Sequence, residues 1–409
     1  MLYTPDMDGL GNIRQVMTLC QELMASLPEL SILILSGTPI MHSFRILDGV
    51  DYIKLPSLME AECHGSGSGF PAKNTHHILK LRSDIILCAV ANFKPDVVLV
   101  DNKPFGVQNE IKSTLAYLYE YLPQTKITLL LREFLDSSER NGEVGARQDY
   151  GAAIKKYYDE IFVLGSPDVF DPPEEYAYTP TMKALPRFRS YLRREPGLRS
   201  RAQVRQELGI SQQEALVLVT AGSGEDGMHI FVNYLQGYAR TPAAQRPHTL
   251  IIFGPEMVPE ARLRLEEWAR KFPRIHTRAF TEDLMSYSYM DAADVVVAMG
   301  GYGTVGEILT LNKPAIVIPR LEPVQEEWIL AQRMEQLGVF QVMQPECLTP
   351  RKLMQSVHAQ LADGFKRAKL VPTLDFQGLP WMNSTFQTLR NGCVPELSPP
   401  IMSENIMKA

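Results

Sequence analysis

The chain has 409 residues, of which 45% are hydrophobic and 22% charged, and its mean hydropathy is -0.11. These values are typical of a globular protein and exclude a fibrous or largely disordered chain. Because a single hydrophobic core stops growing at about 250 to 300 residues, we expect two domains. The net charge of -6 argues against general nucleic-acid binding, which needs a basic face.

The spacing of the cysteines and the composition of the first residues indicate the cellular compartment. Five cysteines are spread along the chain without a Cys-x-x-Cys pair: Cys20, Cys63, Cys88, Cys347 and Cys393. Their spacing indicates neither a disulfide framework nor a zinc site, and we expect no bound cofactor and no metal. The start of the chain lacks the basic and apolar segments of a secretory signal, and no apolar run approaches the roughly 18 residues that span a bilayer. We therefore expect a cytoplasmic protein.

Short apolar runs alternate with longer helical patterns, which predicts β-α-β units and parallel sheets, an α/β fold. The strand candidates of the first half are residues 1–5, 30–37, 96–101, 126–131 and 160–165. Those of the second half are residues 215–222, 248–254, 294–300 and 314–319. An apolar stripe at helical spacing, from Ile13 to Met24, predicts a helix packed on the first sheet.

A basic stretch separates the two halves. It holds eight Lys and Arg residues between Lys183 and Arg205, one acid, and two prolines. We predict a first domain at 1–186, a linker at 187–200, a second domain at 201–375, and a segment at 376–409 that crosses back to the first domain. The stretch has two interpretations: a solvated hinge, or a surface for anionic lipid or a phosphorylated acceptor at the inner face of the membrane.

Three glycine-rich turns follow strand candidates, at residues 4–12, 220–227 and 299–307. Glycine lets the backbone approach a phosphate closely, and the helix that follows presents unpaired N–H groups and a positive dipole end. All three turns are therefore candidate phosphate sites.

The third turn contains Gly-x-Gly-x-x-Gly at Gly301, Gly303 and Gly306. A dinucleotide site also needs an acid at the end of the next strand, about 20 residues on, but that strand ends in Pro319 and Arg320. We therefore do not favour a dinucleotide site. Thr304 and Glu307 have the spacing of a helix capping box, and the alternative is that Glu307 accepts the hydroxyls of a nucleotide ribose.

Residues 292–320, AADVVVAMGGYGTVGEILTLNKPAIVIPR, resemble the donor-binding half of GT-B glycosyltransferases. The resemblance is especially to relatives of the peptidoglycan N-acetylglucosaminyltransferase, which acts on an undecaprenyl-linked acceptor. The motifs DGLGNIRQ, FKPDVVLVDNKPFG, VTAGSGEDG and VIPRLEP resemble a bacterial glycosyltransferase family related to that enzyme. The resemblance covers the chain from Leu2 to Leu379.

The resemblance implies two Rossmann-like domains that face each other across a cleft. The second domain would bind a nucleotide-sugar, usually a UDP-sugar, without a required metal, and the first would bind the acceptor. By position, the implied donor-binding residues are Gly222, Ser223, Gly224, Phe280, Gly300, Gly301, Gly303, Thr304, Glu307, Arg320, Glu326 and Glu327. Gly9, Gly11 and Arg14 would lie on the acceptor or diphosphate side.

Two positions depart from the family pattern. Trp328 stands where relatives have a sugar-reading glutamine, so the donor sugar is not assigned. Asn12 stands where inverting relatives have a histidine base, and its side chain cannot act as a base. The remaining candidates at strand ends are carboxylates, with Asp101 the best placed: Asp6, Asp8, Asp101 and Glu133. The histidines considered as a base are His42, His64, His76 and His77, but no feature of the sequence places any of them at the site.

The sequence leaves three functions open. The first is an inverting glycosyltransferase that uses a nucleotide-sugar and an acceptor that is lipid-linked, a carbohydrate or a small molecule. The second is a nucleotide-sugar-binding protein without transferase activity, which Asn12 and Trp328 suggest. The third is a nucleotide-sugar hydrolase or epimerase that uses the same donor pocket.

Overall fold

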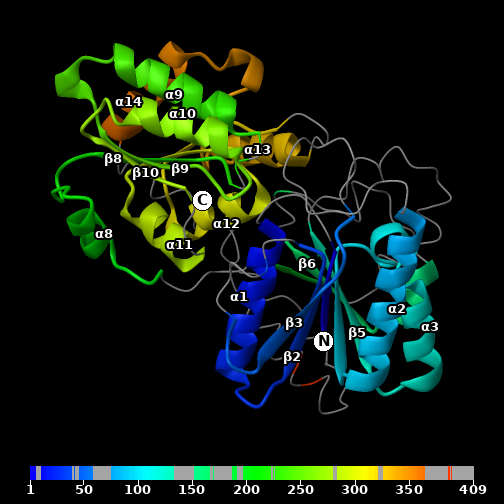
Figure 1. Ribbon diagram of the computed structural model, residues 1–409. Coiled ribbons are helices and arrows are strands. Elements are labelled where there is room, and N and C mark those ends of the chain that lie inside the picture. The colour runs from blue at the N-terminus through cyan, green and yellow to red at the C-terminus, as the bar shows by residue number, and fades with distance from the viewer. Residues whose placement is uncertain are drawn as a thin grey trace, which may run out of the picture.

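The computed structural model describes residues 1–5, 11–38, 41, 46–58, 75–132, 152–165, 169, 187–190, 197–222, 224, 226–279, 283–320, 326–363, 386 and 388. Within these ranges the chain forms two parallel sheets, and each has helices on both faces (Figure 1). The predicted α/β fold with two Rossmann-like domains is confirmed.

The first sheet has seven strands in the order β3-β2-β1-β4-β5-β6-β7, all paired in parallel. They are β1 (Leu2–Thr4), β2 (Ile32–Ser36), β3 (Val50–Lys54), β4 (Val97–Asp101), β5 (Lys126–Arg132), β6 (Glu160–Leu164) and β7 (Arg187–Ser190). Helix α1 (Gly11–Ser26) covers one face, and α2 (Thr75–Phe93) and α3 (Lys112–Tyr121) cover the other. A short 3-10 helix, η3 (Val107–Asn109), precedes α3.

The second sheet has six parallel strands in the order β10-β9-β8-β11-β12-β13. They are β8 (Leu216–Thr220), β9 (His248–Ile252), β10 (Ile275–Arg278), β11 (Val295–Ala298), β12 (Ala315–Val317) and β13 (Gln341–Val342). One face carries α8 (Arg201–Glu207), α11 (Asp283–Ala292), α12 (Tyr302–Leu311) and α13 (Glu326–Gln336). The other carries α9 (Met228–Arg240), α10 (Pro259–Ala269) and α14 (Pro350–Asp363), with η4 (Ala243–Gln245) and η5 (Pro345–Cys347) in connecting loops.

Each sheet reverses its strand order once, between β1 and β4 in the first and between β8 and β11 in the second. In open parallel sheets the loops diverge at such a reversal, and ligands bind outside the carboxyl ends of the strands there. Both reversals fall where the sequence has a glycine-rich turn, after β1 and after β8 and β11.

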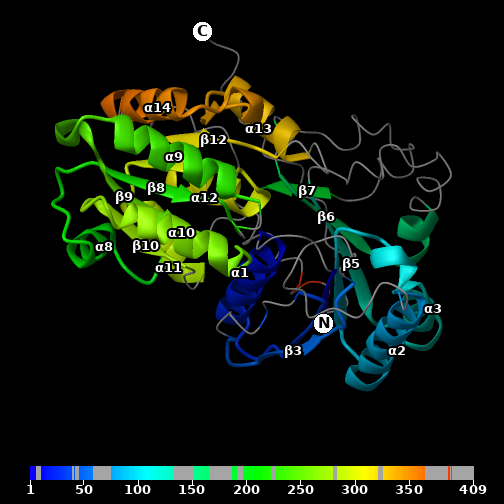
Figure 2. The ribbon, with the colours of Figure 1, turned by 45° about the horizontal axis from the view of Figure 1, so that its top comes forward.

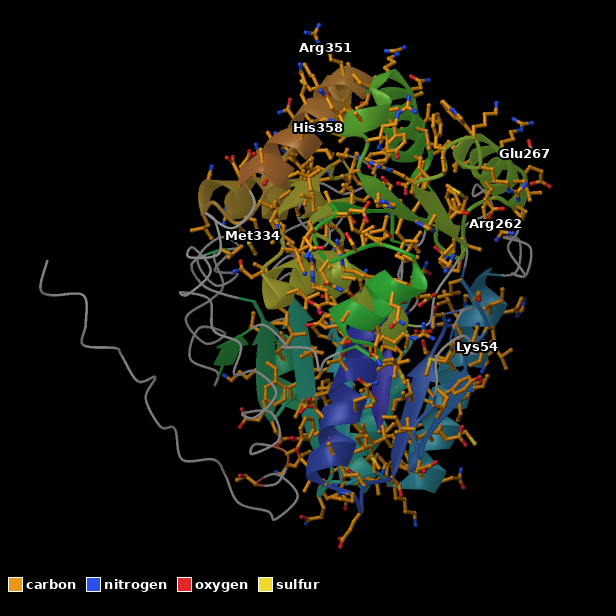
Figure 3. All side chains as sticks on the ribbon, turned by 90° about the vertical axis from the view of Figure 1, so that its left-hand side faces the viewer. Lys54, Arg262, Glu267, Met334, Arg351 and His358 are labelled. Atoms are coloured by element: carbon orange, nitrogen blue, oxygen red, sulfur yellow. The ribbon has the colours of Figure 1, made fainter. Side chains whose placement is uncertain are left out.

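The two domains meet through α1 and α12, which lie side by side (Figure 2). Arg333 on α13 adds a bond, because its Nη1 donates to the carbonyl oxygen of Val169 at 2.8 Å. Val169 lies in the hydrophobic core of the second sheet although it precedes β7 in the chain. Figure 3 shows Arg351 and His358 on α14, at the end of the molecule away from the first domain.

Some segments differ from the sequence-based expectation. Residues 187–190, expected at the start of the linker, form β7 and extend the first sheet. The pattern also missed β3, β10 and β13, which are short or only partly buried. Phe386 packs on the first sheet, with its ring centroid 5.9 Å from that of Phe162, whereas the rest of the segment proposed to cross back lies outside the described residues, except Thr388.

None of the helices within the described ranges is both long and apolar enough to cross a lipid bilayer.

Candidate donor site

The carboxyl ends of β8, β11 and β12 lie next to one another in the second sheet. The turn after β8 depends on its glycines. Gly222 and Gly224 have φ angles of 66° and 92°, in the left-handed region that favours glycine. A Cβ on Gly224 would meet the carbonyl oxygen of Phe253 at 2.1 Å, and one on Gly227 would meet the Ala221 Cβ at 2.1 Å. The turn therefore lies tight against the neighbouring backbone.

The turn after β11 leads directly into α12. Gly300 has a φ of 85°, and a Cβ there would meet Cγ1 of Val317 at 2.3 Å. Gly301 is the N-cap residue of α12. Because it has no side chain, no side-chain cap accepts from the first N–H groups of the helix. Because the first N–H groups of a helix lack partners within it, this end of α12 is suited to bind an anion.

The predicted capping box at this helix is wrong. The helix begins at Tyr302, so Thr304 lies inside its first turn and cannot be the N-cap residue, a position that Gly301 occupies. Glu307 lies one turn further on and is only 1% exposed. Its proposed contact with a ribose stays a prediction.

The third glycine of the motif has no packing role. A Cβ built on Gly306 would meet nothing within 4 Å. In a dinucleotide-binding fold the third glycine allows close packing of helix against strand. Here the space around Gly306 would admit a side chain, so close packing does not require glycine. This is a second reason against a dinucleotide site, besides the missing acid.

Charged side chains from the neighbouring loops gather at this edge. Arg320 follows β12, and its Nε lies 2.6 Å from Oδ2 of Asp226 in the turn after β8. The backbone N–H of Arg320 donates to Oε2 of Glu327 at 3.3 Å. The other carboxylate oxygen of Glu327 would lie 3.5 Å from a Cβ on Gly301. Arg320 and Glu327, both predicted donor-site residues, thus lie beside the glycine turn.

Glu327 is partly buried in the first turn of α13. Burial raises the pKa of its carboxyl group, an effect that the Arg320 guanidinium and backbone N–H oppose and that the Asp226 carboxylate reinforces. An anion that binds next to it would favour the protonated carboxyl still more.

Asp226 was not among the residues that the sequence singled out. Its only signal in the sequence is its position inside the second glycine-rich turn. Nothing in the sequence pairs it with Arg320, which lies 94 residues away and meets it only because β8 and β12 flank β11.

Residues 216–369 match the family described as the glycosyltransferase family 28 C-terminal domain. This range begins at β8 and contains every turn just described. The second domain therefore matches a glycosyltransferase family, and the chain as a whole has the GT-B fold. A search of curated proteins finds no match to this sequence.

Solved structures with this glycosyltransferase's fold cover nearly the whole chain. The calicheamicin glycosyltransferase CalG4 is 16% identical with a TM-score of 0.62, over 96% of this chain and 98% of its own. MurG of Acinetobacter baumannii is 13% identical with a TM-score of 0.56, over 95% and 98%. The Streptomyces sp. SF2575 glycosyltransferase SsfS6, complexed with thymidine diphosphate, is 14% identical with a TM-score of 0.56, over 94% and 98%.

In the first domain, Asp101 ends β4 next to the strand reversal of the sheet. Its side chain is 1% exposed, and Oγ1 of Thr4 donates to its Oδ2 at 2.9 Å. The bond joins the ends of β1 and β4. In this arrangement Asp101 holds the sheet edge together, and its role as a base stays a prediction.

Several predicted site residues of the glycosyltransferase lie outside the described residues. They are Asp6, Asp8, Gly9, Glu133, Ser223 and Phe280, with His42 and His64. Gly11, Asn12 and Arg14 lie in the first turn of α1, and Glu326 begins α13, but the structure does not describe their side chains. His76 and His77 are exposed at the start of α2.

The basic stretch of the glycosyltransferase is partly tied into its own fold. Arg205 is fully buried, and its guanidinium donates to backbone carbonyl oxygens that include Ala292 and Ser211, at 3.0 Å each. Arg201 forms an ion pair with Asp294, and Arg199 one with Glu207. These three arginines therefore make bonds within the second domain, so this end of the stretch is packed on that domain rather than solvated.

Proposed function

We propose that this glycosyltransferase transfers a sugar from a UDP-sugar to an acceptor hydroxyl, with inversion at the anomeric carbon and without a required metal. The observation that carries the proposal is the turn from Gly300 into α12. There Gly300 and Gly301 carry no side chain that would keep a ligand from the backbone, and the first N–H groups of α12 lack partners within the helix. A diphosphate placed at this end would be stabilised both in the donor and as the leaving group.

Arg320 supplies the positive charge of the proposed donor site. Its guanidinium geometry matches phosphate oxygens, and it lies at the end of β12 beside the same turn. In the reaction, the acceptor oxygen bonds to the anomeric carbon while the bond from that carbon to the diphosphate oxygen breaks. The proton of the acceptor hydroxyl passes to a base of the first domain.

That base is a carboxylate in our proposal, because Asn12 cannot accept the proton. Asp101 and Asp8 are the candidates. Asp101 ends β4 next to the strand reversal of the first sheet, and Asp8 follows β1 in the sequence. Because such a carboxylate is a weak base, stabilisation of the leaving diphosphate supplies much of the rate acceleration. The acceptor class stays open between a lipid-linked molecule, a carbohydrate and a small molecule.

Calorimetric titration with UDP, dUDP, TDP, GDP and NAD tests the donor site. We expect UDP to bind most tightly. Glu307→Gln should weaken UDP binding by about tenfold, the effect of losing one charge-assisted hydrogen bond, and should weaken dUDP binding less because dUDP lacks one ribose hydroxyl. Glu335→Gln, at an exposed carboxylate on α13 that accepts from the Val342 N–H, is the control and should leave UDP binding unchanged.

A product assay with the nucleotide-sugar then tests transfer. Release of UDP that requires an added acceptor, with the opposite anomeric configuration in the product, supports the proposal and should persist in the presence of a chelator. Preferred binding of NAD, or release of free sugar without acceptor, would contradict it.

We also propose a cytoplasmic protein with peripheral contact to anionic membrane through the basic stretch. Since Arg199, Arg201 and Arg205 make internal bonds, the contact would rest on the part of the stretch from Lys183 to Arg194. Co-sedimentation with anionic vesicles at low salt should retain the protein. Equal retention by neutral vesicles, or none by either, would exclude this contact.

A further inference from the structure

Asp226 and Arg320 form an ion pair that joins the loops after β8 and β12. Nε of Arg320 lies 2.6 Å from Oδ2 of Asp226, and Nη2 donates to Oδ1 at 2.7 Å. The Asp226 side chain is 45% exposed and the Arg320 side chain is 20% exposed. Because water reaches the Asp226 carboxylate, this pair contributes less to folding stability than a fully buried one. Folding stability is therefore a weak reason for the pair.

The pair spans the strand that carries the proposed phosphate turn. Strand β11 lies between β8 and β12, so a bond between the loops of its two neighbours passes across the edge where Gly300 and Gly301 lie. A guanidinium fixed there is beside the N-terminal end of α12. Both the helix end and the guanidinium attract an anion.

Arg320 is held at two points. Its side chain is held by Asp226, and its backbone N–H donates to the Glu327 carboxylate, whose Oε1 would lie 3.5 Å from a Cβ on Gly301. A free arginine loses much rotamer freedom when a ligand fixes it, and a ligand that meets a preset side chain avoids that loss. These contacts thus fix the position of the guanidinium before a nucleotide binds.

The geometry of the pair is compatible with this role. Asp226 engages the edge of the guanidinium formed by Nε and Nη2, and Nη1 is not part of this pair. A guanidinium has five N–H donors in a planar fork, so one group can contact a carboxylate on one edge and a phosphate on another. Asp226 can therefore orient Arg320 without replacing the ligand.

We propose that Asp226 is a positioning residue of the donor site, which sets the Arg320 guanidinium beside the glycine turn for contact with the diphosphate of the nucleotide-sugar. The inference rests on the proposed donor site. It adds a residue outside the positions that the family resemblance implied, and it gives that residue a role that acts through Arg320.

The test is a double-mutant cycle on nucleotide binding. Dissociation constants for UDP and for uridine are measured by calorimetry with the wild type, Asp226→Asn, Arg320→Gln and the double variant. We expect Arg320→Gln to weaken UDP binding by about tenfold and Asp226→Asn to weaken it several-fold. The double variant should bind UDP no more weakly than Arg320→Gln alone, because Asp226 acts through Arg320.

Uridine separates positioning from a general structural effect. It lacks the diphosphate, so its affinity should be the same in all four proteins. Asp226→Glu keeps the carboxylate and should restore part of the UDP affinity. Glu266→Gln removes the partly exposed ion pairs of Glu266 with Arg262 and Arg270 on α10, at 3.6 and 3.7 Å. It should change neither affinity (Figure 3 shows Arg262 on the outside of the second domain).

The outcomes distinguish this inference from the proposed function. If the wild type binds UDP and Asp226→Asn binds it equally well or more tightly, Asp226 does not position Arg320, and the donor site stands. Additive losses in the double variant, or a parallel loss of uridine affinity, also contradict the inference. If the wild type binds no UDP, the proposed donor site itself fails. Thermal unfolding of each variant verifies that the fold is intact.

Discussion

Arg82 and Glu110 form a fully buried ion pair in the first domain, with two bonds between the guanidinium and the carboxylate. Nε of Arg82 donates to Oε2 at 2.5 Å and Nη2 donates to Oε1 at 2.8 Å. The hydroxyl of Tyr3 donates to the same Oε1 at 2.5 Å. The cluster ties α2 and the segment before α3 to β1, the strand next to the order reversal.

Removal of one partner of this pair should destabilise the first domain strongly. Glu110→Ala leaves the Arg82 charge buried without its carboxylate, which costs about 3 to 5 kcal/mol of unfolding free energy. Urea unfolding followed by circular dichroism measures the loss. Asp84→Asn, which breaks the exposed pair of Lys80 and Asp84, is the control and should cost less than about 1 kcal/mol. Equal losses for the two variants would show that burial of the first pair does not matter.

Gly300 and Gly306 should respond in opposite ways to alanine. At Gly300 the positive φ and the 2.3 Å approach to Val317 predict that alanine lowers the unfolding free energy by about 1 to 3 kcal/mol and weakens UDP binding. Gly306 lies inside α12 with open space around it, so alanine there should stabilise the helix by about 0.5 to 1 kcal/mol.

Thermal unfolding and UDP titration of both glycine variants test this contrast. A Gly306→Ala variant that loses stability would indicate close packing around the third glycine, contrary to the structure. A Gly300→Ala variant with wild-type stability would mean that the turn does not need a left-handed residue.

Glu327 should make stability depend on pH. Since burial raises the pKa of its carboxyl group in the folded protein, the folded state binds more protons than the unfolded chain at a pH between the two pKa values. Its contribution to stability is therefore largest at low pH, and it falls as the pH rises through the raised pKa. Glu327→Gln removes this dependence.

Thermal unfolding at a series of pH values between 4 and 8 compares the variant with the wild type. The stability of Glu327→Gln relative to wild type should increase with pH over this range. A constant difference between Glu327→Gln and wild type would contradict a raised pKa at this position.

Two arginines of the basic stretch should differ in their contribution to stability. Arg205 is fully buried and bonds to several backbone carbonyl oxygens, so Arg205→Ala should lower the unfolding free energy by about 3 kcal/mol or more. Arg199 lies nearly half exposed in its pair with Glu207, and Arg199→Ala should cost less than about 1 kcal/mol. Urea unfolding measures both, and a small loss for Arg205→Ala would return this residue to the candidates for a binding surface.

The sequence by itself determined the class of the fold and the positions of the glycine turns that we propose as the donor site. Buried parallel strands read as continuous apolar runs, such as Val295–Ala298, and their spacing with helices between them predicts parallel sheets. Glycines at the ends of such runs mark turns that only glycine can form, which is why Gly224 and Gly300 could be singled out. These signals are local, so the sequence displays them directly.

Tertiary structure alone decided which charged side chains meet. Asp226 and Arg320 become neighbours through the order of three strands, and sequence distance gives no hint of it. Glu307 and Asp101, chosen by position, turn out to be buried because helix and sheet close around them. Arg205 belonged to an apparently solvated basic stretch, yet its guanidinium bonds to carbonyl oxygens inside the second domain. Partners of charged groups are set by packing between distant segments, and packing has no signature in a single sequence.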